Sequence, residues 1–176
     1  MSALAEGGVQ ALDAVHGSVE ELEWLTKSAL SIVVVGASGD LAKKKTFPSL
    51  LNLYDDNLLP KKSKIWGFAR SNMSNDDLRD RLRPFLTSEH HSKEVVESFL
   101  QKCVYKSGKS YGDENAFREL TSSIEEFEKE NDDKHLNRLF YFAIPPSAFA
   151  DTGVAIKRTA MQDESKGWSR LIVEKP

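Results

Sequence analysis

The stretch SIVVVGASGDLAKKK, residues 31–45, decides the fold of this chain. It contains a β-branched run, Ile32–Val35, which ends at Gly36 and has the pattern of a buried strand. Gly36, Gly39 and Ala42 recur at intervals of three residues, and three lysines follow in succession. A strand that ends in a glycine turn and continues into a helix is the unit that holds the phosphates of a dinucleotide. We therefore expect a phosphate-binding turn at this point.

The glycine spacing is G-x-x-G-x-x-A rather than the commoner G-x-G-x-x-G. It keeps a flexible first position, no side chain at the closest approach to the pyrophosphate, and a small residue where helix and strand cross. A P-loop is rejected because Lys44, not glycine, precedes Lys45 and Thr46. The alternative that stays open is a turn that binds nothing. The carboxylate of Asp40 would repel a pyrophosphate, so we expect it to face the backbone or a lysine.

Strand and helix patterns alternate along the rest of the chain. Apolar runs predict further strands at residues 65–69, 103–108, 139–144 and in the closing segment 168–176. The helix after the glycine turn should kink or break near Pro48. Ser74 is expected to cap the next helix, whose predicted apolar face is Leu78, Leu82, Phe85 and Leu86. The pattern predicts an α/β fold: a Rossmann-like, doubly wound, mainly parallel sheet with helices on both faces.

The second predicted strand ends in Arg70, where an NAD site carries an acidic residue for the ribose 2′-hydroxyl. A guanidinium binds a 2′-phosphate through two parallel hydrogen bonds, and it can also stack on adenine. The sequence therefore favours NADP. The separation from Gly36 is 70 − 36 = 34 residues, longer than usual, so the connecting helix must be long. The alternative is a solvated arginine at a strand end.

Charge and hydropathy exclude several classes of protein. The chain of 176 residues has 24 basic and 27 acidic side chains and a net charge of −3, which argues against nucleic acid or an anionic membrane as partner. No apolar run approaches the roughly 20 residues that span a bilayer. The first 26 residues are acidic and lack lysine, which fits neither a signal peptide nor a transit peptide. We therefore expect a cytoplasmic protein.

Cysteine and histidine give no sign of a metal site. Cys103 is the one cysteine, which rules out a disulfide framework, and its apolar neighbours predict a buried, inert thiol. The four histidines do not recur at ligand spacing: His16, His90, His91 and His135. We expect no bound metal.

Four segments give the chain a specific resemblance. They are GASGDLAKKKTFPSLLNLY (36–54), GFAR (67–70), NRLFYFAIPP (137–146) and LIVEKP (171–176). Their order and spacing resemble those of glucose-6-phosphate dehydrogenase, and the resemblance runs from about Ser31 to Pro176. It implies a Rossmann-like coenzyme domain, followed in the family by a larger α+β domain that forms the homo-oligomer interface. The implied reaction moves a hydride from C1 of glucose 6-phosphate to NADP and gives 6-phosphogluconolactone, the first step of the oxidative pentose phosphate pathway.

The resemblance also implies residue roles. The coenzyme-binding residues carried over are Gly36, Ala37, Ser38, Gly39, Asp40, Leu41, Lys43, Arg70, Tyr141 and Lys175. Among them, the Ser38 hydroxyl is expected to donate to the coenzyme and Tyr141 to lie beside the nicotinamide. Lys175 of the EKP motif matches a lysine that contacts both the sugar phosphate substrate and the coenzyme, and Pro176 matches the proline that shapes that turn. From the residues alone, EKP would be a strand end with an exposed charged pair.

The family's catalytic histidine lies in an RIDHYLGK-like segment beyond the position of Pro176, and none of the four histidines here has that context. We therefore expect residues 29–176 to be an NADP-binding domain without catalytic activity of its own, in a chain that looks truncated. Residues 1–28 are expected to be a leader, with a possible short helix from Ser18. Two alternatives stay open: a stand-alone NADP-binding module or regulator without catalysis, and a different NADP oxidoreductase with the same domain.

Overall fold

The computed structural model describes residues 25–131 and 135–174. Five parallel strands form one sheet in the order β3-β2-β1-β4-β5. The strands are β1 (Ser28–Val35), β2 (Lys62–Ala69), β3 (Cys103–Ser107), β4 (His135–Phe142) and β5 (Ser169–Val173). The helices are η1 (Ala42–Thr46), α3 (Phe47–Asp55), α4 (Asn75–Leu86), α5 (Lys93–Gln101), α6 (Glu114–Asn131), η2 (Pro146–Ala148) and α7 (Phe149–Thr159). The predicted Rossmann-like fold is confirmed.

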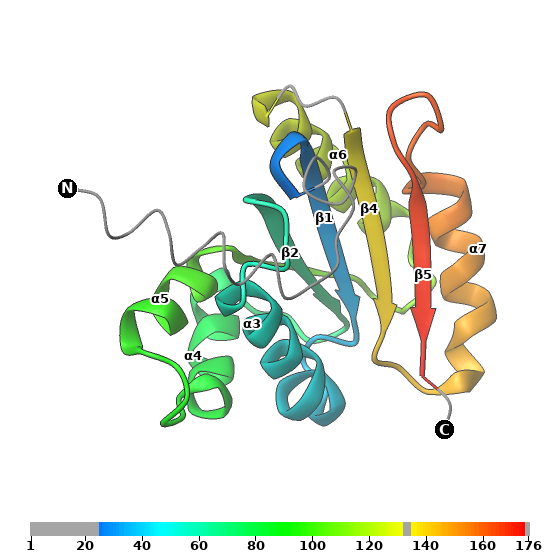
Figure 1. Ribbon diagram of the computed structural model, residues 1–176. Coiled ribbons are helices and arrows are strands. Elements are labelled where there is room, and N and C mark those ends of the chain that lie inside the picture. Colours follow the sequence, from blue (N-terminus) through cyan, green and yellow to red (C-terminus); the bar gives the residue numbers. More distant parts are fainter. Residues whose placement is uncertain (1–24, 132–134, 175–176) are drawn as a thin grey trace.

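Two hydrophobic layers hold the helices on opposite faces of the sheet (Figure 1). Strand β1 serves both layers because successive side chains of a strand point to opposite faces. Ile32 and Val34 pack with α3, α4 and α5, whereas Val33 and Val35 pack with α6 and α7. The β-branched run is therefore buried on both sides, as in the central strand of a doubly wound sheet.

The helix after the glycine turn changes from π-helical to α-helical geometry just before Pro48, where the sequence predicted a kink or break. Residues Ala42–Thr46 form a π-helical turn, in which the Phe47 amide donates to the Ala42 carbonyl, five residues back. Proline has no amide hydrogen for the usual bond to the residue four positions back. The π turn brings Pro48 into the first turn of α3, where that loss costs little, so the helix continues to Asp55.

Helix α4 begins as predicted, although one residue of its predicted apolar face is misplaced. The Ser74 hydroxyl accepts from the Asp77 amide, and the Asp77 carboxylate accepts from the Ser74 amide, which makes a capping box. Leu78, Leu82 and Leu86 are buried. The prediction for Phe85 was wrong: it is 40% exposed, and the Lys43 ammonium lies 5.8 Å from its ring centre.

The order of the strands places the reversal of the sheet between β1 and β4. From β1 the chain builds outward through β2 and β3, then returns to add β4 and β5 on the other side of β1 (Figure 1). Open α/β sheets bind ligands in the crevice at the carboxyl ends of the two strands that flank such a reversal.

The two ends of the chain meet the predictions only in part. The predicted leader lies outside the described residues except for 25–28, where 25–27 are helical and Ser28 opens β1. At the other end, the predicted closing strand reached Pro176, whereas β5 ends at Val173. The proline and the lysine before it lie outside the described residues.

Candidate dinucleotide site

The glycine turn begins at Gly36, a position that only glycine can occupy. Its φ is +90°, in the left-handed region. A Cβ there would lie 2.3 Å from the carbonyl oxygen of Ala143, just after β4. The Gly36 amide donates to the Phe68 carbonyl of β2 at 2.7 Å. This residue therefore joins the carboxyl ends of β1, β2 and β4.

Gly39 has fewer close protein neighbours than Gly36. A Cβ at this position would lie 3.1 Å from the Gly36 carbonyl oxygen, a tight contact that a shift of a few tenths of an ångström would relieve, and the backbone is not left-handed. The fold alone therefore demands a glycine less strictly here than at Gly36, and no other atom of the described residues closes the site to a ligand. Ala42 is fully buried between helix and sheet, as its small size suggested. Of the other residues of the turn, Ala37 is buried and Leu41 is exposed.

Asp40 faces the lysines, as expected. Its two carboxylate oxygens lie 3.0 Å from the Lys43 ammonium and 3.4 Å from that of Lys44. These contacts hold the pKa of Asp40 below its ordinary value. Asp40 therefore partly neutralises the charge of Lys43. Its own carboxylate is paired with the two lysines and is not a free negative charge beside the crevice.

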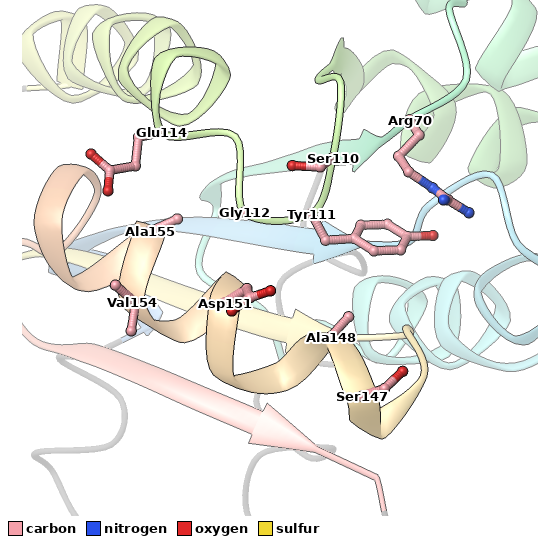
Figure 2. A pocket seen from close by; sticks show the side chains of 10 residues that line it. All are labelled: Arg70, Ser110, Tyr111, Gly112, Glu114, Ser147, Ala148, Asp151, Val154 and Ala155. Atoms are coloured by element: carbon pink, nitrogen blue, oxygen red, sulfur yellow. The ribbon is translucent and has the colours of Figure 1, made fainter.

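Arg70 directly follows β2, as predicted, and opens onto a pocket of about 470 Å³. The pocket lies at the carboxyl edge of the sheet, between the loop after β3 and the start of α7 (Figure 2). Its lining residues are Arg70, Ser110, Tyr111, Gly112, Glu114, Ser147, Ala148, Asp151, Val154 and Ala155. The Arg70 guanidinium lies 4.9 Å from the centre of the Tyr111 ring and has no carboxylate partner within the described part of the chain. Its hydrogen-bond donors are therefore free for an anionic ligand.

Tyr105 anchors the segment that carries Arg70. Its hydroxyl donates to the Ser71 carbonyl at 2.6 Å, and its amide donates to the Asn75 side chain at 2.7 Å. The Ser71 hydroxyl in turn donates to the Ser38 hydroxyl at 3.3 Å. Ser38 thus accepts from the neighbouring segment and keeps its own hydrogen for a further acceptor. The glycine turn and the end of β2 are linked.

Tyr141 lies on the opposite side of the crevice, near the end of β4. Its hydroxyl donates to the Glu174 carboxylate, which follows β5. Burial, and then the bond to Glu174, raise the pKa of Tyr141 to about 12, so the phenol stays protonated at neutral pH. Tyr141 and Glu174 therefore hold the ends of β4 and β5 together.

The EKP motif is described only at its first residue, Glu174. Lys175, the predicted substrate and coenzyme residue, lies outside the described residues. Pro176, the predicted turn residue and the point beyond which the family's catalytic histidine is expected, lies outside them as well. The roles given to these two residues therefore stay predictions.

Cys103 is buried, as its apolar neighbours predicted. Burial raises its pKa to about 12. The thiolate, which is the reactive form, is therefore negligible at neutral pH, as an inert thiol requires.

Comparison with known proteins places the chain in a family. Residues 33–176 match the model of the family described as glucose-6-phosphate dehydrogenase, NAD binding domain. The chain belongs to the glucose-6-phosphate dehydrogenase family. Glucose-6-phosphate 1-dehydrogenase 6, cytoplasmic, from Arabidopsis thaliana is 44% identical over 153 residues, which cover 84% of this chain and 30% of the relative. The cytoplasmic isoform from Solanum tuberosum is 45% identical, covering 84% of this chain and 29% of the relative.

A solved structure gives the same assignment. Glucose-6-phosphate dehydrogenase in complex with its substrate glucose-6-phosphate superposes with a TM-score of 0.78 at 42% identity, over 85% of this chain and 31% of that one. The chain therefore spans about 30% of the length of the relatives that it matches. The family carries a nicotinamide dinucleotide domain, and the present chain contains that domain.

The residues present fit such a coenzyme. Gly39 leaves an open approach at the turn, the first amides of the following helix have no intrahelical partner, and Arg70 presents free donors at the pocket. Sequence reasoning missed Tyr111, Tyr105 and Glu174, which hold Arg70, Ser71 and Tyr141. Their local signals are weak: Tyr105 lies within β3, Tyr111 lies in the loop after it, and Glu174 directly follows β5. No helix within the described ranges is long and apolar enough to cross a membrane.

Proposed function

We propose that this domain binds NADP, with the pyrophosphate at the Gly36–Lys43 turn and the 2′-phosphate on Arg70. The observation that carries the proposal is the guanidinium of Arg70 at the end of β2, unpaired by any carboxylate of the described residues and open to the pocket. An acidic residue at this position would instead accept a hydrogen bond from the 2′-hydroxyl of NAD and would repel a phosphate. Ser38 keeps a free donor close to the same place.

The test is a charge reversal at Arg70, with Arg170→Glu as the matched control. Both arginines stack on an aromatic ring, Arg70 on Tyr111 and Arg170 on Trp168, but Arg170 lies near the start of β5. Arg70→Glu should weaken NADP binding by about 100-fold and NAD binding by less than about threefold, because charge-assisted hydrogen bonds to the phosphate become repulsion. The control should leave both dissociation constants unchanged. Equal loss for the two dinucleotides in Arg70→Glu would remove the NADP assignment.

We further propose that the domain serves the oxidation of glucose 6-phosphate to 6-phosphogluconolactone, with NADP as hydride acceptor. Family membership supports this, as does the substrate named for the superposed structure. When bound, the coenzyme supplies the hydride acceptor. In this chain Tyr141 is held protonated beside the crevice by Glu174, and Lys175 is proposed to contact both substrate and coenzyme.

A polypeptide of these 176 residues should not form NADPH from glucose 6-phosphate, because removing the proton from the sugar hydroxyl needs a base in place. None of its histidines lies in the family's catalytic segment, which we expect beyond the position of Pro176. The measurement is absorbance at 340 nm with purified chain, glucose 6-phosphate and NADP. Formation above a no-enzyme control, lost with Arg70→Glu, would show that the chain carries its own base.

We also propose a cytoplasmic location and homo-oligomeric assembly. The names of the Arabidopsis and potato relatives support the location, and the family resemblance implies the assembly. Subcellular fractionation tests the first, and sedimentation of the native protein tests the second.

A further inference from the structure

We propose that Tyr111 is a positioning residue that holds the Arg70 guanidinium ready for the 2′-phosphate and thereby sets the preference for NADP over NAD. This inference rests on the proposed NADP function. Figure 2 shows the Tyr111 ring and the Arg70 side chain beside each other at one end of the pocket. The guanidinium carbon lies 4.9 Å from the centre of the ring. No hydrogen bond or ion pair holds Arg70 among the described residues, so this stacking is what fixes its direction.

The form of this contact suits a phosphate ligand. A guanidinium is planar, and all of its donors lie in its plane. The Tyr111 contact places the guanidinium carbon over the ring and takes up no carboxylate, so donors of the guanidinium remain for two parallel bonds to phosphate oxygens. A carboxylate partner would have occupied those donors. The contact therefore orders Arg70 without consuming the donors that a phosphate needs.

Tyr111 is itself firmly held. Its loop connects β3 to α6, and the Gly108 amide at the start of the loop donates to the Ala69 carbonyl, directly before Arg70. A Cβ at Gly108 would lie 2.6 Å from the Phe68 ring, so the loop lies directly on the end of β2. Asp113 accepts from the Lys109 amide with one oxygen and from the Ala116 amide with the other. These bonds hold the pKa of Asp113 below its ordinary value, so its charge and both bonds persist at neutral pH.

The body of the Tyr111 ring also packs against the hydrophobic layer under α6 and α7. A ring that packs against the core and also contacts Arg70 is more restricted than a free surface side chain. Holding a flexible arginine in its bound direction lowers the entropy lost on binding. The lower entropy cost favours a ligand whose 2′-phosphate binds the guanidinium, such as NADP. It does not help NAD, which has no 2′-phosphate.

The experiment is a double-mutant cycle at Arg70 and Tyr111, read with two probes that differ only in the 2′-phosphate. The probes are 2′,5′-ADP and 5′-AMP, titrated calorimetrically into the full chain and into Tyr111→Leu, Tyr111→Phe, Arg70→Ala and the double variant. Tyr111→Leu should weaken 2′,5′-ADP by about threefold to fivefold, the range for an exposed cation–π contact, and leave 5′-AMP unchanged. Tyr111→Phe keeps the ring and should restore wild-type affinity. In the Arg70→Ala background, Tyr111→Leu should have no further effect.

Several results would overturn the proposal. Equal weakening of both probes by Tyr111→Leu would show a merely structural role, as would a full effect of Tyr111→Leu in the Arg70→Ala background. If the wild-type chain does not prefer 2′,5′-ADP to 5′-AMP, the NADP function itself fails, and this inference fails with it. If the preference for 2′,5′-ADP over 5′-AMP depends on Arg70 but not on Tyr111, the proposed role of Tyr111 is wrong and the NADP function stands.

A second measurement does not depend on the folding of any variant. The Tyr111 ring should shift the side-chain proton resonances of Arg70 upfield in the free wild-type chain, because those protons lie over its face. Random-coil shifts for the Arg70 side chain would contradict the stacked arrangement.

Discussion

The two sides of the carboxyl edge of the sheet are built differently. On the β1–β2 side, Val33, Val34 and Val35 are fully buried, and the turn after them is tied to β2 by the Phe68 carbonyl and through Ser38 and Ser71. On the β4–β5 side, the outermost strand β5 leaves Leu171, Ile172 and Val173 between 41% and 51% exposed. The half of the site that we propose for the coenzyme is thus self-supporting within the described residues. The other half consists of Tyr141 and Glu174 beside an open, apolar strand.

The largest expected effect separates two glycines of the same turn. Gly36→Ala places a Cβ 2.3 Å from a carbonyl oxygen in a left-handed backbone, so it should lower the free energy of unfolding by more than about 3 kcal/mol. Gly39→Ala has no left-handed backbone to strain, and its Cβ would lie 3.1 Å from the Gly36 carbonyl oxygen, a contact that a small shift relieves, so the change should be about 1 kcal/mol or less.

Gly39→Ala, which costs less stability than Gly36→Ala, should nevertheless reduce the affinity for NADP in a chain that still folds. Gly39→Ala should weaken binding at least tenfold (about 1.4 kcal/mol) because its methyl group enters the open approach. Urea denaturation and calorimetric titration measure the two properties. A Gly39→Ala chain that is stable and binds NADP normally would show that the turn does not hold the pyrophosphate at this point.

A buried ion pair tests the β4 side. Arg138 on β4 bonds both oxygens of Glu128 on α6 at 2.8 and 2.7 Å, and its remaining nitrogen donates to the Ala160 carbonyl after α7. Arg138→Leu leaves Glu128 buried without its partner and should cost about 3–5 kcal/mol. Arg170→Leu, on the neighbouring exposed strand, should change stability by less than about 0.5 kcal/mol. Similar losses for both variants would mean that burial of the pair contributes little.

Tyr105→Phe should have a smaller effect on the β2 side. It removes the donor to the Ser71 carbonyl and should cost about 1 kcal/mol, with a loss of NADP affinity but little loss of NAD affinity. Urea unfolding of the wild type and the variant measures the first, and titration with both dinucleotides measures the second. A variant that binds both dinucleotides like wild type would mean that this bond does not position Arg70.

The same residue gives a dependence on pH. Burial raises the pKa of Tyr105 and of Tyr141 to about 12 in the folded chain, against about 10 when unfolded. The folded state therefore keeps protons that the unfolded state loses, so this contribution to stability is complete below pH 10 and declines as the pH rises to 12. Absorbance at 295 nm should show two phenols ionising late, and each Tyr→Phe variant should remove one. Ordinary titration of either phenol in the wild type would contradict its burial.

The smallest effect on stability is expected at the β5 edge. Leu171→Lys should change the free energy of unfolding by less than about 0.5 kcal/mol, since the side chain is half exposed. It should, however, reduce self-association of the isolated chain, because an exposed apolar edge strand promotes pairing and a lysine opposes it. Light scattering of wild type and variant at matched concentration makes the comparison. Unchanged scattering would show that this edge is not where chains associate.

Sequence predicted most of the strands and the glycine turn because those features are local. Ile32–Val35 and Gly36 carry their own strand and turn signals. The start of β4 at His135, before the predicted Leu139, was missed because polar Asn137 and Arg138 gave no strand signal. Arg138 lies buried there because Glu128, ten residues earlier, neutralises it.

The site was predictable where one residue type at one strand end suffices, and not where it depends on a distant partner. The position of Arg70 directly after β2 was predicted from the sequence and is confirmed, whereas its role stays a proposal. Tyr111 could not be found in this way because the loop that brings it to Arg70 is set by Gly108 and Asp113, whose contacts are tertiary. Phe85 was placed inward by its helical spacing, yet the face that it occupies meets Lys43 rather than the core.

The central claim is that the glycine turn after β1 and Arg70 at the end of β2, held in place by Tyr111, distinguish NADP from NAD. The most direct measurement is the change in backbone amide shifts of the ¹⁵N-labelled chain during titration with NADP. We expect the largest shifts, with saturation, at Gly36, Gly39, Arg70 and Tyr111. The shifts at Arg70 and Tyr111 should be smaller when NAD is used instead. Shifts confined to other elements, or identical shifts at Arg70 for both dinucleotides, would contradict it.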